Sequence, residues 1–225
     1  EATIVVDEGY PRDVTDVTDL VLKMKSAGAE VVFPIGYLND QMLILRTMYE
    51  LGYKAVVFGG GGGFLLKEFG EALGPAVENC LSTSLWQWDM NVPGLPDFSK
   101  KFKELYPEEG WPMETAGTHY AATYLLYETL ERAASADPEK VRHTLATIDI
   151  SCTREKPNRA LCIPSYDKST GMFRIKFNEI GQNIYASYTE PTSGGGVVIM
   201  QWQKGEMVTV WPEWAARPGA ELHRP

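Results

Sequence analysis

Apolar positions recur with a helical period and then form short extended runs through the first quarter of the chain. Residues 16–27 and 39–51 carry apolar side chains every three or four positions, which is typical of amphipathic helices. The β-branched and aromatic runs 30–35 and 55–58 follow these helices and are typical of buried strands. Two successive helix–strand units predict right-handed crossovers and a parallel sheet, which is an α/β fold.

Glycine is concentrated where both of these strands are predicted to end. Ile35-Gly36-Tyr37 ends the first strand, and the five consecutive glycines 59–63 follow the second. Open parallel sheets bind their ligands at the carboxyl ends of the strands. The two segments therefore predict a ligand site made of bare backbone and one tyrosine.

The rest of the chain predicts mainly helices first and mainly strands later. Residues 1–7 are typical of a core strand, and the Pro- and Gly-rich stretch 91–96 is typical of a domain crossing. The further predicted elements are a helix at 65–72, a strand at 80–86, helices at 97–105, 113–134 and 140–147, a strand at 173–177, and a hairpin with strands 197–202 and 207–211.

Composition and charge exclude several classes of protein. Of the 225 residues, 44% are hydrophobic and 23% are charged, and no apolar run is long enough to span a bilayer, so direct membrane insertion is not expected. The net charge of −9 argues against a nucleic-acid partner, because neutralising phosphates requires a basic face.

The three cysteines, Cys80, Cys152 and Cys162, carry no metal-binding pattern. Cys80 lies beside an apolar strand and is interpreted as a small buried hydrophobe. Cys152 and Cys162 flank a polar loop, where a disulfide would contribute about 2–3 kcal/mol and would imply an oxidising compartment. Two unpaired thiols are the alternative.

Motifs for nucleotide binding and for catalysis are absent from the sequence. Gly63 is followed by Phe64, where a phosphate-binding loop needs lysine and a dinucleotide fingerprint needs glycine. No nucleophile elbow and no metalloprotease motif occurs, and Asp7 and Glu8 are adjacent strand residues that face opposite ways. The histidines stand apart from any nucleophile; they are His119, His143 and His223. The protein is therefore predicted to be no enzyme and to need no cofactor.

Aromatic residues near the strand ends favour a small-molecule site instead. Tyr37 follows Gly36, and Trp86 and Trp88 follow the third predicted strand just before the linker. Aromatic rings with a polar tip are typical of such clefts. Packing of one or both tryptophans in a hinge is the alternative.

Several segments, in this order and spacing, closely resemble the Leu/Ile/Val-binding-protein type of periplasmic solute receptor. Each motif is weak by itself, but together they extend over nearly the whole chain. The segments are Asp16-Val-Thr-Asp-Leu, Ala29-Glu-Val-Val-Phe-Pro-Ile-Gly-Tyr, Ile44-Leu-Arg-Thr-Met-Tyr, Thr118-His-Tyr-Ala-Ala-Thr-Tyr, Ile175-Lys-Phe-Asn-Glu-Ile-Gly, and Gln201-Trp-Gln-Lys-Gly-Glu-Met-Val-Thr-Val-Trp-Pro.

This resemblance implies a type I periplasmic-binding-protein fold, in which two α/β lobes joined by hinge strands close on a ligand that an ABC permease accepts. It implies a periplasmic or other extracytoplasmic location. Residues 1–92 would form most of lobe II, 93–150 a helical return into lobe I, and 151–225 the hinge strands, the C-terminal hairpin and the tail. The family's N-terminal region would precede residue 1, so a truncated or proteolysed product is expected.

One position departs from the family pattern. Amino-acid-binding members carry an acidic residue after the strand that matches 55–58, where it pairs with the ligand ammonium, whereas this chain has Gly61. Tyr37 matches the family's cleft tyrosine. The resemblance therefore predicts a small organic ligand that is amino-acid-like, aromatic or a carboxylate, stacked on Tyr37 or Trp86, and that is not a simple aliphatic amino acid. The alternative function is a ligand-sensing domain of a signalling receptor or regulator.

Overall fold

The computed structural model describes residues 2–60, 63–153, 165–186 and 193–224. These residues form two compact units, which are described separately. Unit 1 comprises Glu1–Thr83, Ile199–Val208 and Glu221–Pro225, and unit 2 comprises Ser84–Val198 and Thr209–Ala220. The lobe boundaries implied by the family resemblance remain a prediction.

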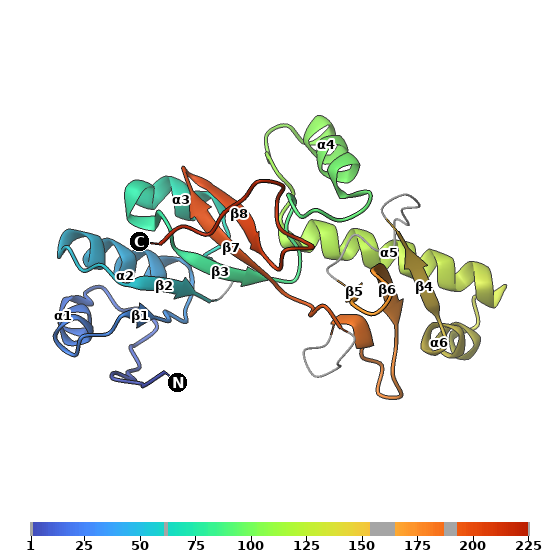
Figure 1. The fold of residues 1–225 in the computed structure, drawn as a ribbon, viewed down its shortest axis with the longest axis horizontal. Helices are drawn as coiled ribbons and strands as arrows, with labels where there is room; N and C mark the ends of the chain where they lie inside the picture. Colours follow the sequence, from blue (N-terminus) through green and yellow to red (C-terminus); the bar gives the residue numbers. More distant parts are fainter. Residues whose placement is uncertain (1, 61–62, 154–164, 187–192, 225) are drawn as a thin grey trace. The chain divides into compact units, whose positions relative to one another are not determined.

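Unit 1 is built on a sheet in the order β1-β2-β3-β7-β8 (Figure 1). The pairs β1–β2 and β2–β3 are parallel, as the helix–strand pattern predicts. The strands are β1 (Val31–Val32), β2 (Val56–Gly59), β3 (Leu81–Ser84), β7 (Val198–Gln203) and β8 (Glu206–Trp211), and the last two continue into unit 2.

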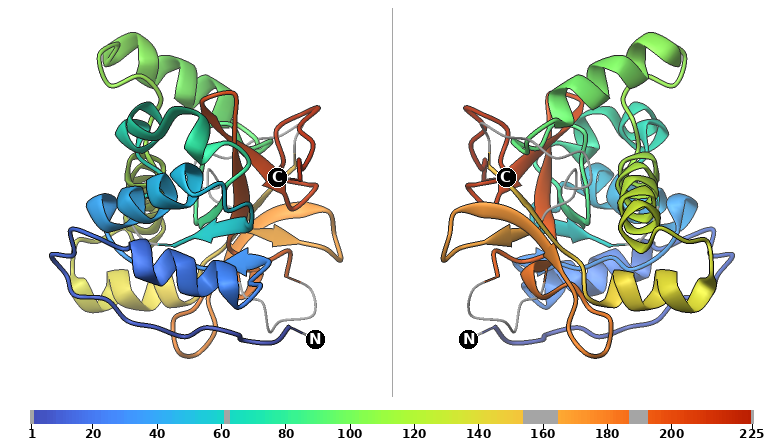
Figure 2. Two further views of the ribbon diagram at one scale, coloured as in Figure 1. Left: turned by 90° about the vertical axis from the view of Figure 1, so that its left-hand side faces the viewer. Right: turned by 90° about the vertical axis from the view of Figure 1, so that its right-hand side faces the viewer.

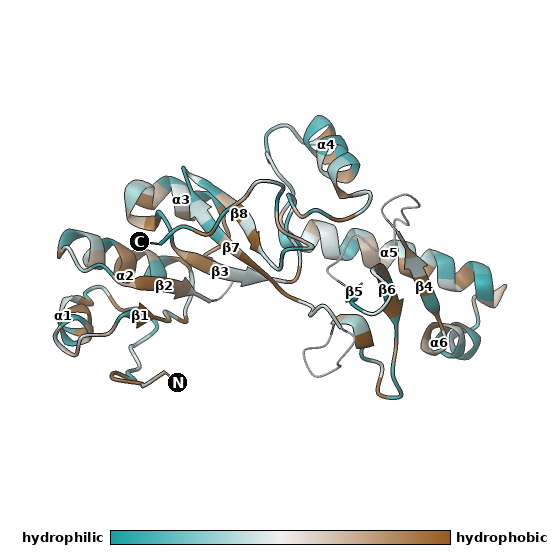
Figure 3. Cartoon of the chain, viewed as in Figure 1, coloured by the Kyte–Doolittle hydropathy of each residue, from teal (hydrophilic) through white to brown (hydrophobic). Residues whose placement is uncertain are grey.

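The helices of unit 1 are stacked in sequence order beside the sheet, α1 on α2 and α2 on α3 (Figures 1 and 2). They are α1 (Thr18–Ser26), α2 (Leu38–Glu50), α3 (Lys67–Leu73) and the 3-10 turn η1 (Gly74–Val77). Their apolar stripes and the apolar β2 form the core, as the brown segments of Figure 3 indicate. Buried core residues include Val21, Ile44, Leu45, Met48 and Phe69.

The predicted N-terminal strand is wrong. Residues 2–7 form no strand, and the Ile4 side chain is 80% exposed. A strand requires a neighbour with which to form ladder hydrogen bonds, and β1 lies at the end of the strand order without residues 2–7 beside it. For the same reason β1 is only half buried: Val32 is in the core, whereas Val31 and Phe33 face outward.

The predicted C-terminal hairpin is confirmed. Strands β7 and β8 are neighbours in the sheet, and the turn between them consists of Lys204 and Gly205, both at positive φ. Two central residues at positive φ match the type I′ turn, whose twist suits a two-residue hairpin.

Unit 2 combines helices with an antiparallel sheet in the order β4-β6-β5. Strand β6 was expected from its alternating pattern, and β4 and β5 pair on either side of it. The elements are α4 (Leu95–Leu105), α5 (Glu114–Ala133), α6 (Pro138–Ala146), β4 (Asp149–Cys152), β5 (Tyr166–Asp167), β6 (Met172–Lys176) and the 3-10 turn η3 (Ile184–Ala186).

Candidate functional site

The ends of β1 and β2 lie side by side, as the parallel-sheet argument requires. Ile35 and Gly60 form a parallel bridge, and the Gly60 amide donates a hydrogen bond to the Pro34 carbonyl at 3.1 Å. Gly63 packs on the start of α2 so closely that a Cβ there would be 2.5 Å from the Leu38 Cα. The two glycine segments therefore meet at the N-terminus of α2. Gly61 lies outside the described residues, so its predicted role stays a prediction.

One side chain ties the two strand ends together. The Gln41 amide nitrogen donates to the Gly36 carbonyl at 2.6 Å and also to the Gly60 carbonyl. The side chain is fully buried, and its Oε1 has no hydrogen-bond partner among the described residues.

The sequence analysis missed Gln41, although a signal was present. Gln41 lies on the same face of α2 as Leu45 and Met48, at helical spacing, and both of these are buried. A polar residue on the apolar face of an amphipathic helix indicates a buried side chain that makes specific hydrogen bonds, as the Gln41 amide nitrogen does.

Asp40 and Tyr10 fix the segment that precedes α2. One Asp40 carboxylate oxygen accepts from the Tyr37 amide at 2.9 Å, and the other accepts from the Tyr10 hydroxyl at 3.1 Å. The same hydroxyl lies 3.0 Å from the Ile35 carbonyl. Burial, with the Asp40 hydrogen bond and charge, raises the pKa of Tyr10 to about 12, so the phenol remains a neutral donor at physiological pH.

Glycine is required at position 36 because these groups approach it so closely. A Cβ on Gly36 would lie 2.1 Å from the Asp40 carboxylate oxygen and 2.5 Å from the Tyr10 hydroxyl oxygen. A side chain at this position would therefore displace both groups from the segment that they hold.

Tyr37 presents its ring to solvent at this edge of the sheet. It is the N-cap residue immediately before α2, and it is 70% exposed. The guanidinium carbon of Arg12 lies 5.7 Å from the centroid of the Tyr37 ring, within the range of a cation–π contact. Gly36 and Tyr37 are therefore brought together with Arg12, which the sequence analysis did not single out.

The two predicted site tryptophans belong to unit 2, whereas the strand ends described above belong to unit 1. Trp86 is 0% exposed and packs on Gly117, where a Cβ would be only 2.0 Å from the indole ring. Trp88 stacks on Trp111 at 3.9 Å, and the Arg217 guanidinium lies over the Trp88 ring at 4.9 Å. These contacts favour the alternative, in which the tryptophans pack within the fold, and a ligand contact by Trp86 or Trp88 stays a prediction.

The cysteines are described only in part. Cys80 and Cys152 are both buried. Burial raises the pKa of the Cys80 thiol to about 12, as expected of an inert core residue. Cys162 lies outside the described residues, so the disulfide between Cys152 and Cys162 stays a prediction.

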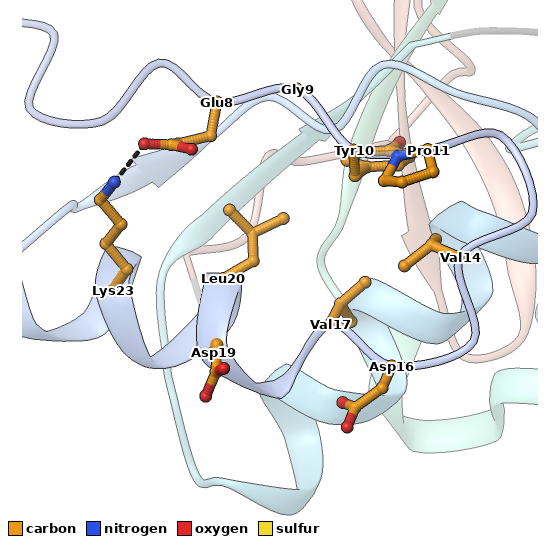
Figure 4. Close-up of a pocket in the computed structure, with 10 residues that line it drawn as sticks. All are labelled: Glu8, Gly9, Tyr10, Pro11, Val14, Asp16, Val17, Asp19, Leu20 and Lys23. Carbon is orange, nitrogen blue, oxygen red and sulfur yellow. Dashed lines mark hydrogen bonds and ion pairs between the residues drawn. The ribbon is translucent and has the colours of Figure 1, made fainter.

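A cavity of about 500 Å³ lies between the N-terminal segment and α1 (Figure 4). Its lining runs from Glu8 to Tyr10 on one side and includes Leu20 and Lys23 on the other, with an ion pair between Lys23 and Glu8. Tyr10 is shared between the lining of this cavity and the strand-end site. Within the described ranges, no helix is long and apolar enough to cross a membrane.

Parallel helix–strand units whose glycine-rich ends meet at one edge of the sheet are characteristic of α/β proteins that bind a ligand at that edge. The family described as periplasmic binding protein matches residues 1–161 of this chain. A relative, the Leu/Ile/Val-binding protein homolog 7 of Brucella abortus, is 30% identical over 221 residues, which are 95% of this chain and 49% of that protein. The chain therefore belongs to the periplasmic binding protein family.

Solved structures support the same fold. A leucine binding protein from Thermotoga maritima gives a TM-score of 0.63 at 20% identity, over 93% of this chain and 51% of that chain. A branched-chain amino acid transporter substrate binding protein from Streptococcus pneumoniae, solved in complex with isoleucine, gives 0.57 at 17% identity, over 96% and 51%. The type I periplasmic-binding-protein fold is thus confirmed, and the chain spans about half the length of these proteins.

Proposed function

We propose that this chain is part of an extracytoplasmic solute receptor that captures a small organic molecule by hinge closure and delivers it to an ABC importer. The observation that carries the proposal is the pair of strand ends that Gln41 bridges beneath the exposed Tyr37. Such preformed backbone at the carboxyl ends of parallel strands is where open sheets bind their ligands. Binding without chemical conversion fits the periplasmic binding protein family.

The ligand that we propose is an aromatic or carboxylate compound. A ring that is 70% exposed at the site offers a stacking surface, and Gly61 supplies no carboxylate for an ammonium group. The similar proteins named above are described as binding leucine, isoleucine or valine, so an aliphatic amino acid is the competing ligand. The chain spans about half the length of those proteins, so hinge closure and delivery to an importer are proposed for the whole receptor of which this chain is a part.

Thermal-shift screening followed by titration calorimetry tests the proposal, on the protein expressed with its natural flanking sequence. The compounds are L-leucine, L-phenylalanine and 4-hydroxybenzoate. We expect the aromatic compounds to raise Tm, and Tyr37→Ala to weaken their binding about fivefold, since stacking between two aromatic rings is worth on the order of 1 kcal/mol.

Tyr49→Ala is the matched control, because Tyr49 lies on α2, the helix that Tyr37 precedes, and is 57% exposed. It should bind every compound as the unmodified protein does. Binding of leucine in preference to both aromatic compounds would contradict the proposed ligand class, and binding unaffected by Tyr37→Ala would contradict the proposed site.

A further inference from the structure

An arginine beside the proposed site is held there by local structure. The Tyr10 hydroxyl anchors the N-terminal segment to the end of β1, at 3.0 Å from the Ile35 carbonyl. Pro11 follows with its restricted φ, and its carbonyl accepts a hydrogen bond from the Val14 amide at 3.2 Å. Arg12 therefore lies within a turn that is anchored on one side to the strand end, and its guanidinium lies over the Tyr37 ring.

Arg12 forms no ion pair with a carboxylate in the described part of the chain, where the ion pairs are made by other lysine and arginine residues. Asp40 is the acidic residue that shapes this loop, but both of its oxygens already accept hydrogen bonds, from Tyr37 and Tyr10. Arg12 therefore has its full bidentate hydrogen-bonding capacity available, in a protein whose net charge is −9.

We infer that Arg12 recognises a carboxylate group of the ligand while the apolar body of that ligand lies against Tyr37. The planar guanidinium matches the two oxygens of a carboxylate and gives stronger hydrogen bonds than a neutral donor. Because a net negative protein repels anions, a local cation is needed for an anionic ligand to bind here. The inference rests on the proposed function and specifies the ligand class as organic carboxylates.

Matched pairs of carboxylates and their neutral amides test the inference by titration calorimetry. The pairs are benzoate with benzamide, phenylacetate with phenylacetamide, and L-leucine with L-leucinamide. We expect a carboxylate to bind about tenfold to a hundredfold more tightly than its amide, because hydrogen bonds to charged groups are worth about 1.5–3 kcal/mol. Arg12→Gln should abolish that preference, and raising the ionic strength should weaken carboxylate binding in the unmodified protein only.

Arg142→Gln is the charge-matched control, since Arg142 is an exposed residue of α6 in unit 2. It should retain the carboxylate preference, and the Tm of both variants without ligand should stay unchanged. Arg12→Lys should bind carboxylates more tightly than Arg12→Gln and less tightly than the unmodified protein, because lysine keeps the positive charge but lacks the paired N–H donors of the guanidinium. If amides bind as tightly as carboxylates, or if Arg12→Gln binds carboxylates normally, the inference is wrong while the proposed function stands. If no compound binds, both are wrong.

Discussion

The close contact between Gly117 and Trp86 makes a sharp prediction about stability. A Cβ at position 117 would lie 2.0, 2.1 and 2.4 Å from three atoms of the fully buried indole. Overfilling a packed core costs about 1–3 kcal/mol, and an overlap with three ring atoms belongs at the upper end. Alanine gains about 1 kcal/mol over glycine in a helix interior. Gly117→Ala should therefore lower the free energy of unfolding by about 2 kcal/mol, which for a chain of this size lowers Tm by about 4–8 °C.

A double-mutant cycle with Trp86→Phe separates the steric cause from other effects. The Trp86 indole nitrogen has no hydrogen-bond partner among the described residues, so phenylalanine loses no hydrogen bond while it removes part of the ring system that opposes Cβ. Urea unfolding should show the double variant to be more stable than the sum of the single effects predicts, by about 1 kcal/mol or more.

Gly9→Ala controls for the substitution itself, because nothing lies within 4 Å of a Cβ at Gly9. It should change stability by less than about 0.5 kcal/mol. The packing argument is refuted if Gly117→Ala unfolds at the same urea concentration as the unmodified protein, or if its effect and that of Trp86→Phe simply add.

Three other outcomes are expected. Folding raises the pKa of Tyr10 from 10.0 to about 12, so the contribution of Tyr10 to stability is complete below pH 10 and is lost as the pH rises toward 12. The free energy of unfolding, measured with urea across that pH range, should therefore fall less steeply for Tyr10→Phe than for the unmodified protein. Asp89→Asn should lower the free energy of unfolding in urea by about 3 kcal/mol, because the buried carboxylate accepts hydrogen bonds from the Thr209 amide at 3.0 Å and from the Arg217 side chain at 2.7 Å. Thr209→Val, which removes only a hydroxyl, should lower it by about 1 kcal/mol. Peptide mass mapping without reductant should find Cys152 joined to Cys162, and two alkylated thiols at these positions would contradict the disulfide.

Helices were predictable to within a residue or two because their signal is local. The long helix was expected at 113–134 and spans Glu114–Ala133, since its apolar period lies entirely within its own sequence. Strands depend on partners as well. Residues 1–7 have the composition of a strand, but residues 2–7 have no ladder neighbour in the described part of the chain, and β5, with only Tyr166–Asp167, is too short to carry any period. Sequence pattern thus predicts a strand reliably only where the order of the sheet supplies a neighbour.

The same distinction explains which parts of the candidate site the sequence could indicate. The meeting of the two glycine segments followed from topology alone, because parallel strands end at one edge, and the bridge between Ile35 and Gly60 bears this out. The tryptophans near the linker carried an equally suggestive signal, yet whether a ring is open or covered depends on residues far along the chain, here Gly117 and Arg217. Tyr10 reaches the site from 25 residues before Ile35, a contact that no spacing rule could supply. Sequence pattern therefore locates the strand ends, whereas the side chains that meet there depend on contacts made by the fold.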